Sequence, residues 1–164
     1  MNKSDYEQIE AFMLTHMTDS AHDPHHIYRV LNAAVDIARY ESGVDMDVLI
    51  AACILHDIGR EQQFADHSLC HAQIGSEMAY DFLISQRWET SRASHVQACI
   101  ITHRFRKGNI PASIEAKILF DADKLEAAGA MGIMRTLSHG GQVNEPLYVL
   151  SENGNVEFLT QRAK

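Results

Sequence analysis

The sequence predicts an all-α protein, a single-domain bundle of about six or seven helices. Apolar residues recur at the three- and four-residue spacing of helices along most of the chain, and no stretch alternates like a good strand. The 164 residues are 46% hydrophobic and 22% charged, which suffices for one hydrophobic core. We therefore expect residues 1–164 to form one domain, with an irregular tail over about 140–164.

Capping signals predict where the helices begin and end. Ser4 followed by Glu7 has the spacing of a capping box and predicts a first helix there. Asp23-Pro24 predicts the start of a second helix, because Asp caps and Pro favours the first position, and Gly43 should end it. Later helices are expected over about 68–86, over about 89–103, and from 111 or 113 through 124 with a continuation toward 137.

A third helix is expected to begin after Asp45, which can cap it. Its residues 48–55 are apolar almost all round, so this helix should be buried. The helix runs into His56-Asp57, and Gly59 should close it and expose these two polar residues.

Composition limits the partners and the location. The formal net charge of −8 argues against a nucleic-acid polymer, because phosphate-backbone binding needs many Lys and Arg contacts. No apolar run is long enough for a membrane span and the first residues lack signal-peptide features, so we expect a cytoplasmic protein without a membrane partner. The three cysteines lack CxxC spacing and are expected to be free thiols. The oligomeric state stays open, a homodimer included.

Helix lengths bring two histidines together. The segment from His26 to the end of the second helix is roughly 24 Å long, and the return from Asp45 to His56 is roughly 18 Å. Two helices joined by a short turn at Gly43 should pack antiparallel. His26, near the start of one helix, is therefore expected beside His56, near the end of the next.

Asp57 and a fourth group from another helix complete the predicted site. His56 and Asp57 are adjacent and project about 100° apart, so they can grip an ion that lies between neighbouring helices. Asp123 is the best fourth candidate, because residues 118–120 are apolar enough to be internal while Asp121, Asp123 and Lys124 follow. Buried charges need a partner or a metal.

Two imidazoles and two carboxylates are a mixed nitrogen and oxygen donor set. Such a set suits Mn, Fe, Ni, Co or Zn, whereas Mg is less favoured. A bound divalent ion would also make an acidic chain compatible with a small phosphorylated substrate, because the ion reverses the local field. A water on such an ion loses its proton near neutral pH and becomes a nucleophile. No organic cofactor is expected.

Three segments resemble the HD superfamily of metal-dependent phosphohydrolases, whose signature is H…HD…D on an all-helical bundle. The segment from His22 to Val30 resembles the family's first-His segment, with His26 in the ligand position. His56-Asp57-Ile58-Gly59 matches the doublet that names the family, and Phe120 to Ala127 resembles its final acidic segment. The resemblance covers most of the chain and implies a helical hydrolase of a small bacterial single-domain branch.

The resemblance also implies roles for further residues. The family's last metal-binding Asp usually precedes a Lys or Arg directly, which selects Asp123 over Asp121 and leaves Asp121 as the alternative. His71 and His103 fall in the interval where binuclear members carry additional metal-binding histidines. They are therefore predicted to hold a second metal or to bind the substrate's phosphate.

Basic residues near these segments are candidates for phosphate contacts. Lys124 offers a mobile point charge and Arg29 a bidentate fork, but either side chain can instead pair with a structural carboxylate. Arg60 follows the doublet and Arg104 follows His103, and their roles stay open.

The leading hypothesis is metal-dependent hydrolysis of a phosphate bond in a nucleotide or other small phosphorylated metabolite. In it Asp57 orients the attacking water, and Lys124, His71 or His103 stabilises the developing charge. A di-iron oxygenase on the same scaffold is an alternative that requires both His71 and His103 as ligands. A nucleotide-sensing module without turnover is a third hypothesis.

Overall fold

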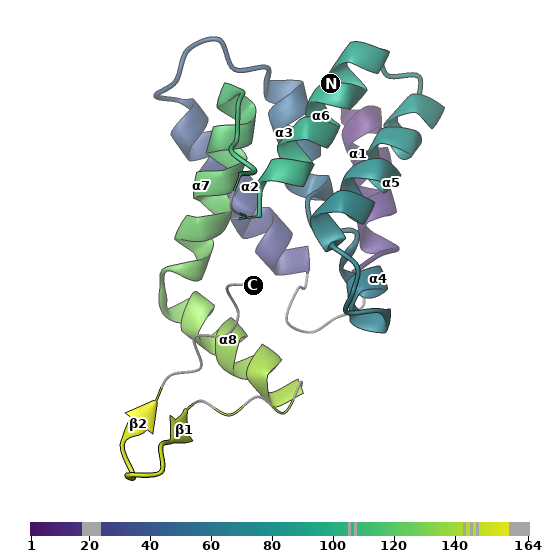
Figure 1. The fold of residues 1–164 in the computed structure, drawn as a ribbon. Helices are drawn as coiled ribbons and strands as arrows, with labels where there is room; N and C mark the ends of the chain where they lie inside the picture. Colours follow the sequence, from purple (N-terminus) through teal and green to yellow (C-terminus); the bar gives the residue numbers. More distant parts are fainter. Residues whose placement is uncertain are drawn as a thin grey trace. The chain divides into compact units, whose positions relative to one another are not determined.

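The computed structural model describes residues 1–17, 24–104, 106, 108–142, 144, 146 and 148–157, which form eight helices and one short hairpin. The predicted all-α fold is confirmed (Figure 1). The chain divides into two compact units, Met1–Glu126 and Ala127–Lys164. The first contains α1 (Lys3–Leu14), α2 (Pro24–Ala38), α3 (Met46–Leu55), α4 (Arg60–Ala65), α5 (His71–Ser85), α6 (Thr90–Thr102) and nearly all of α7 (Ile114–Ala127).

Helix α3 lies at the core of the first unit. Its residues 48, 49 and 51–55 are all buried, as the run of apolar residues predicts. It packs against α1, α2, α5 and α6 (Figure 1). Asp45 caps it as expected, with its carboxylate accepting from the backbone N–H groups of Asp47 and Val48. The buried helix carries His56 and Asp57 at its end and so holds them inside the unit.

The cap of the first helix and the end of the second differ from the prediction, whereas the second helix begins at the predicted proline. The capping box of α1 is formed by Asn2 and Asp5, whose side chains accept from each other's backbone N–H at 2.9 and 3.0 Å, and not by Ser4 and Glu7. The proline at position 24 is the first residue of α2, while the predicted cap at position 23 lies outside the described residues. Helix α2 ends at residue 38, before Gly43. Gly43 has a φ of 76° and lies in the connection that follows the helix.

The turn after α3 is buried, which corrects one expectation. His56 and Asp57 are 0% exposed, although Gly59 was expected to expose them. Gly59 does not adopt a left-handed conformation, since its φ is −86°. A Cβ at position 59 would lie 2.4 Å from the carbonyl oxygen of His71 and 2.7 Å from the backbone nitrogen of Gly75. Gly59 therefore lets α5 pack directly on the turn and cover the doublet.

We expect the Gly59→Ala substitution to destabilise the protein by about 1–3 kcal/mol, because backbone cannot give way as a flexible side chain does. The urea midpoint of unfolding measures the change. Gly141→Ala, in a helix and with nothing within 4 Å of the added Cβ, is the control and should be neutral or stabilising by up to about 1 kcal/mol. Equal stability of Gly59→Ala and wild type would contradict the close packing.

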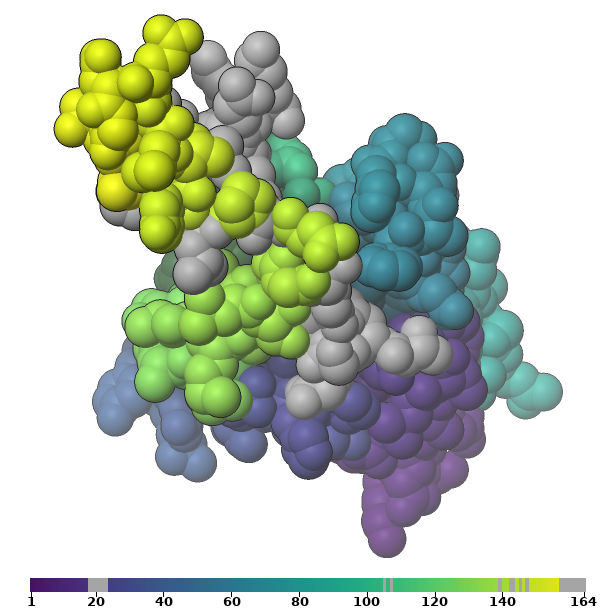
Figure 2. Space-filling model, turned by 90° about the horizontal axis from the view of Figure 1, so that it is seen from below, coloured from purple at the N-terminus to yellow at the C-terminus, as the bar shows by residue number. Residues whose placement is uncertain are grey.

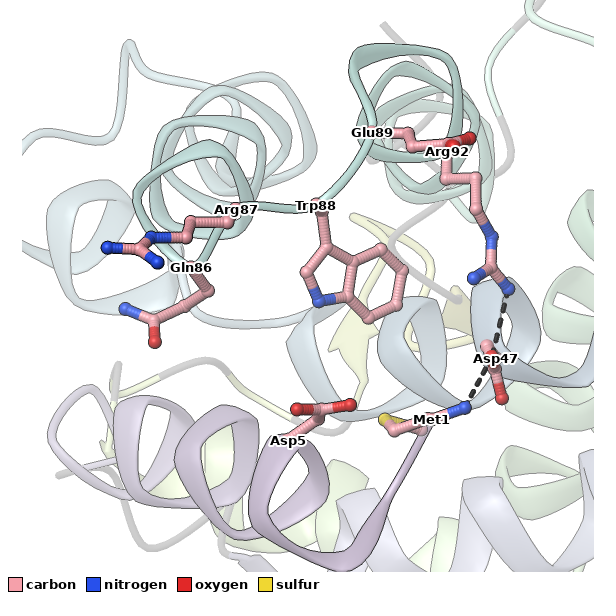
Figure 3. Close-up of a pocket in the computed structure, with 8 residues that line it drawn as sticks. All are labelled: Met1, Asp5, Asp47, Gln86, Arg87, Trp88, Glu89 and Arg92. Atoms are coloured by element: carbon pink, nitrogen blue, oxygen red, sulfur yellow. Dashed lines mark hydrogen bonds and ion pairs between the residues drawn. The ribbon is translucent and has the colours of Figure 1, made fainter.

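Helix α5 ends in a left-handed residue that is not glycine. Arg87 has φ of 65°, its N–H donates to Ile84 O, and the N–H of Trp88 donates to Leu83 O, both at 3.0 Å. This hydrogen-bond pattern is a Schellman motif, which usually has glycine at the left-handed position. Arg87 and Trp88 border a hollow of about 380 Å³ (Figure 3), and the other residues that line it are Met1, Asp5, Asp47, Gln86, Glu89 and Arg92. None of the predicted metal ligands lines this hollow.

We expect Arg87→Gly to raise stability by up to about 1 kcal/mol, because glycine adopts this conformation without the Cβ penalty. The melting temperature measures the gain. Arg39→Gly removes the same charge from an exposed turn after α2, where the backbone is not left-handed, and should give no gain. A loss of stability in Arg87→Gly would show that the arginine side chain contributes more than its backbone costs.

The second unit contains α8 (Ala130–Gln142) and a hairpin of β1 (Val149–Leu150) and β2 (Val156–Glu157). The strands pair antiparallel, with Val149 opposite Glu157 and Leu150 opposite Val156. The hairpin, in yellow, follows α8 in this unit (Figure 2). The predicted continuation of the last helix is interrupted, since α7 ends at residue 127 and α8 begins at residue 130. None of the described helices has the length and apolar character needed to cross a membrane.

Candidate metal centre

Ends of several helices meet at one buried centre in the first unit. Antiparallel packing of α2 and α3 brings His26 and His56 together, with ring centroids 5.4 Å apart, as the helix lengths predict. His71 is the first residue of α5, and His103 follows the last residue of α6. All four histidines are at most 1% exposed. The predicted site residues gathered here are His26, His56, Asp57, His71, His103 and Asp123.

The Asp57 carboxylate stands between the four histidines. Its Oδ2 atom lies 3.7 Å from His26 Nε2 and 3.6 Å from His56 Nε2. Its Oδ1 atom lies 3.5 Å from both His71 Nε2 and His103 Nε2. One carboxylate thus faces two pairs of imidazoles, one pair with each oxygen.

Asp123 joins the first of these pairs. Its Oδ1 atom lies 3.6 Å from His26 Nε2 and 4.0 Å from His56 Nε2. The alternative ligand, Asp121, is exposed. The donor atoms therefore form two groups. The first group is His26, His56 and Asp123, and the second group is Asp57, His71 and His103.

Side-chain acceptors orient two of the imidazoles. His26 Nδ1 lies 3.2 Å from a carboxylate oxygen of Glu126, which is 4% exposed. His71 Nδ1 lies 2.6 Å from Gln63 Oε1. The amide of Gln63 is itself oriented, because its Nε2 donates to the carbonyl oxygen of Leu69 at 2.9 Å. Both imidazoles therefore carry their proton on Nδ1.

Backbone carbonyls orient the other two imidazoles. His56 Nδ1 donates to Cys53 O at 2.8 Å, and His103 Nδ1 donates to Ile100 O at 2.6 Å. With all four Nδ1 atoms bound to acceptors, the Nε2 lone pairs point into the centre. The Nε2 atoms of His71 and His103 lie only 3.4 Å apart, an arrangement that needs a cation or a proton between them.

Burial and charge set the protonation states. Burial lowers the pKa of His56 and, with the nearby charges of Arg60 and Arg104, that of His71, so both imidazoles stay neutral. Burial opposes ionisation of Asp57, but the Arg60 guanidinium holds the pKa of this carboxyl well below its usual range. Neutral imidazoles around an ionised carboxylate are the protonation states in which these groups bind metals.

The donor set fits a divalent metal ion. His56 Nε2 and Asp57 Oδ2 are buried and make no hydrogen bond to any described residue, although buried polar atoms normally have a partner. Two donors that each lie about 2.1 Å from one ion are at most about 4.2 Å apart, which the distances above satisfy. Imidazole nitrogens with carboxylate oxygens suit Mn, Fe, Ni, Co or Zn.

Each candidate phosphate ligand also holds a carboxylate near the centre. Lys124 Nζ lies 2.6 Å from Asp123 Oδ2, and its side chain is 43% exposed. Arg29 donates from Nε and Nη2 to one Glu126 oxygen, both at 2.8 Å. Both residues therefore pair with a carboxylate, which is the alternative to a phosphate contact in the sequence analysis. Their side chains are partly exposed and stay available to a substrate.

Sequence reasoning assigned no role to Glu126 or Gln63. Glu126 follows Asp123 by three residues and so lies on the same face of α7, a spacing that could have identified it. Gln63 lies in the short helix α4, which the helical pattern did not predict, and nothing in its sequence context links it to His71.

The fold and this centre define an all-helical protein with a buried set of metal-binding side chains. The HD domain matches residues 25–128, the span that contains all six donor residues, and the chain belongs to this family. Membership supports an enzyme of the metal-dependent phosphohydrolase class in general, and the HD domain implies binding of a divalent metal.

Several bacterial proteins are similar to the chain over most of its length. The uncharacterized protein YpgQ of Bacillus subtilis is 32% identical over 159 residues, which are 93% of this chain and 75% of that protein. Its crystal structure in complex with ADP has a TM-score of 0.67 and 28% identity, covering 89% of this chain and 70% of that one. A predicted HD superfamily hydrolase from an uncultured Thermotogales bacterium has a TM-score of 0.70 and 30% identity, covering 94% and 87%.

Proposed function

We propose that the protein hydrolyses a phosphate bond in a nucleotide or another small phosphorylated metabolite. The observation that carries the proposal is the buried Asp57 carboxylate, faced by four Nε2 atoms whose rings are fixed by Nδ1 acceptors. The ADP complex of YpgQ supports a nucleotide as the substrate class. The chain's net charge of −8 supports a small substrate over a nucleic-acid polymer.

The proposed ligands of the principal metal are His26, His56, Asp57 and Asp123. A divalent ion supplies Lewis-acid polarisation of a phosphoryl oxygen and a water that loses its proton near neutral pH. Asp57, ionised and central, accepts a hydrogen bond from the attacking water and orients it. Lys124, at the edge of the centre, compensates the charge that develops on the phosphoryl oxygens. His71 and His103 bind either a second ion or the phosphate itself.

The test is release of phosphate or pyrophosphate from a panel of nucleoside mono-, di- and triphosphates and a simple phosphomonoester. We expect release from the Mn²⁺-loaded protein, loss of release after chelation, and loss in His56→Ala. Asp121→Ala removes an exposed carboxylate from the same helix as Asp123 and should remain active. Absence of both products from every compound would contradict the proposal.

A di-iron oxygenase is a second candidate because His71 and His103 both face Asp57 Oδ1, as that activity requires. Loading the protein anaerobically with iron and recording Mössbauer spectra before and after admission of oxygen tests it. A coupled di-iron centre that consumes oxygen together with an added substrate would favour the oxygenase. Iron that stays mononuclear would remove it.

A further inference from the structure

Arg60 makes an ion pair at the oxygen that the second group shares. Its Nε atom lies 2.9 Å from Asp57 Oδ1. The same oxygen lies 3.5 Å from His71 Nε2 and from His103 Nε2. An ion held by the second group would therefore share Asp57 Oδ1 with the Arg60 guanidinium. The two cations would repel each other across a single carboxylate oxygen.

The first group has more carboxylates around it than the second, although Lys124 pairs with Asp123 Oδ2 and Arg29 pairs with Glu126. The first group contains the carboxylate of Asp123, is faced by Asp57 Oδ2, and has the Glu126 carboxylate behind His26. Asp57 is the one carboxylate of the second group, whose other two members are His71 and His103.

Neutral groups support the imidazoles of the second group. The acceptor behind His71 is the amide oxygen of Gln63, and the acceptor behind His103 is the carbonyl oxygen of Ile100. A carboxylate behind a ligating histidine makes the ligand more basic, and amide oxygens do so less. The number of carboxylate ligands and the basicity of the histidine ligands therefore both favour an ion in the first group over an ion in the second.

We infer that Arg60 limits the centre to one firmly bound ion, so that a second ion binds only when Arg60 leaves Asp57 Oδ1. This inference rests on the proposed metal centre and adds to it a residue that sets metal occupancy. Arg60 is the first residue of α4, a helix of six residues, and its side chain is 28% exposed. It can therefore turn toward solvent or toward a substrate's phosphate without unpacking the core.

The test is titration of the metal-free protein with Mn²⁺ by calorimetry and by electron paramagnetic resonance, without substrate. We expect wild type to bind one ion firmly and a second at least about tenfold more weakly. Arg60→Gln removes the charge and should tighten the second ion about tenfold or more, with the signal of a spin-coupled Mn²⁺ pair at two equivalents. The first ion should change much less.

Two control variants separate charge from other effects. Arg60→Lys retains the positive charge and should keep the wild-type preference for one ion. Arg39→Gln removes an exposed arginine that pairs with Asp36 on α2, and it should also behave as wild type.

Equal, firm binding of two ions by wild type would overturn the inference, as would an unchanged second affinity in Arg60→Gln. Binding of no ion by any variant would overturn both this inference and the proposed function. The titration does not depend on turnover, so failure of the hydrolase proposal is seen separately, in the phosphate-release assay.

Discussion

The Asp57→Ala variant is expected to lose the metal that the wild-type protein retains. Among the described residues, Asp57 is the one carboxylate that faces both pairs of histidines. Its removal should therefore lower the metal affinity by at least about 100-fold, more than is typical for groups that only support a ligand. Elemental analysis of the purified, untagged proteins measures the change. Wild type should retain about one Mn, Fe, Ni, Co or Zn ion per chain, and in Asp57→Ala phosphate release should disappear with the metal.

The matched control is Asp121→Ala, which removes an exposed carboxylate and should retain its metal. Circular dichroism should show that both variants keep their helices. Equal metal contents in Asp57→Ala and wild type would contradict the central role of Asp57. If wild type took up no metal even from excess ions, the hydrolase proposal would fail at its base and a nucleotide-sensing module would become the better hypothesis.

The Glu126→Gln variant should bind metal about 10- to 100-fold more weakly than wild type. The Glu126 carboxylate accepts from His26 Nδ1 and so raises the basicity of the Nε2 atom that faces the centre. An amide can still accept this hydrogen bond, but it lacks the negative charge that strengthens the ligand and pairs with Arg29. Calorimetric titration with Mn²⁺ measures the affinity.

Glu10→Gln provides the comparison for this variant. Glu10 also accepts hydrogen bonds within the first unit, from the hydroxyl groups of Tyr28 and Tyr6 at 2.7 and 3.4 Å, but it touches no candidate ligand among the contacts described. Its replacement should leave the metal affinity unchanged. Similar affinities in Glu126→Gln and wild type would mean that Glu126 serves the ion pair with Arg29 and does not support His26.

Local patterns were sufficient for the main features of the fold. Helical spacing predicted the helices other than α4, although it did not predict the break between α7 and α8. The apolar run over residues 48–55 predicted that α3 is buried, because burial of that helix depends on its own composition. Helix lengths also placed His26 beside His56. The prediction failed at α1, where Asn2 and Asp5 form the capping box, since two capping patterns lay within a few residues and spacing does not rank them.

The three segments that contain His26, His56-Asp57 and Asp123 identified the candidate ligands from the sequence. The family match supports the class of enzyme. Tertiary structure decided how two of those ligands are supported, because the carboxylate behind His26 and the amide behind His71 come from segments that sequence periodicity does not relate. The pairing of Arg60 with Asp57 is local, since the two residues are three positions apart. Periodicity reports which face of one helix is apolar, whereas the contacts behind His26 and His71 depend on how α2, α4, α5 and α7 pack. Burial of the His56-Asp57 turn was likewise decided by α5, because only a glycine at position 59 lets its backbone approach so closely.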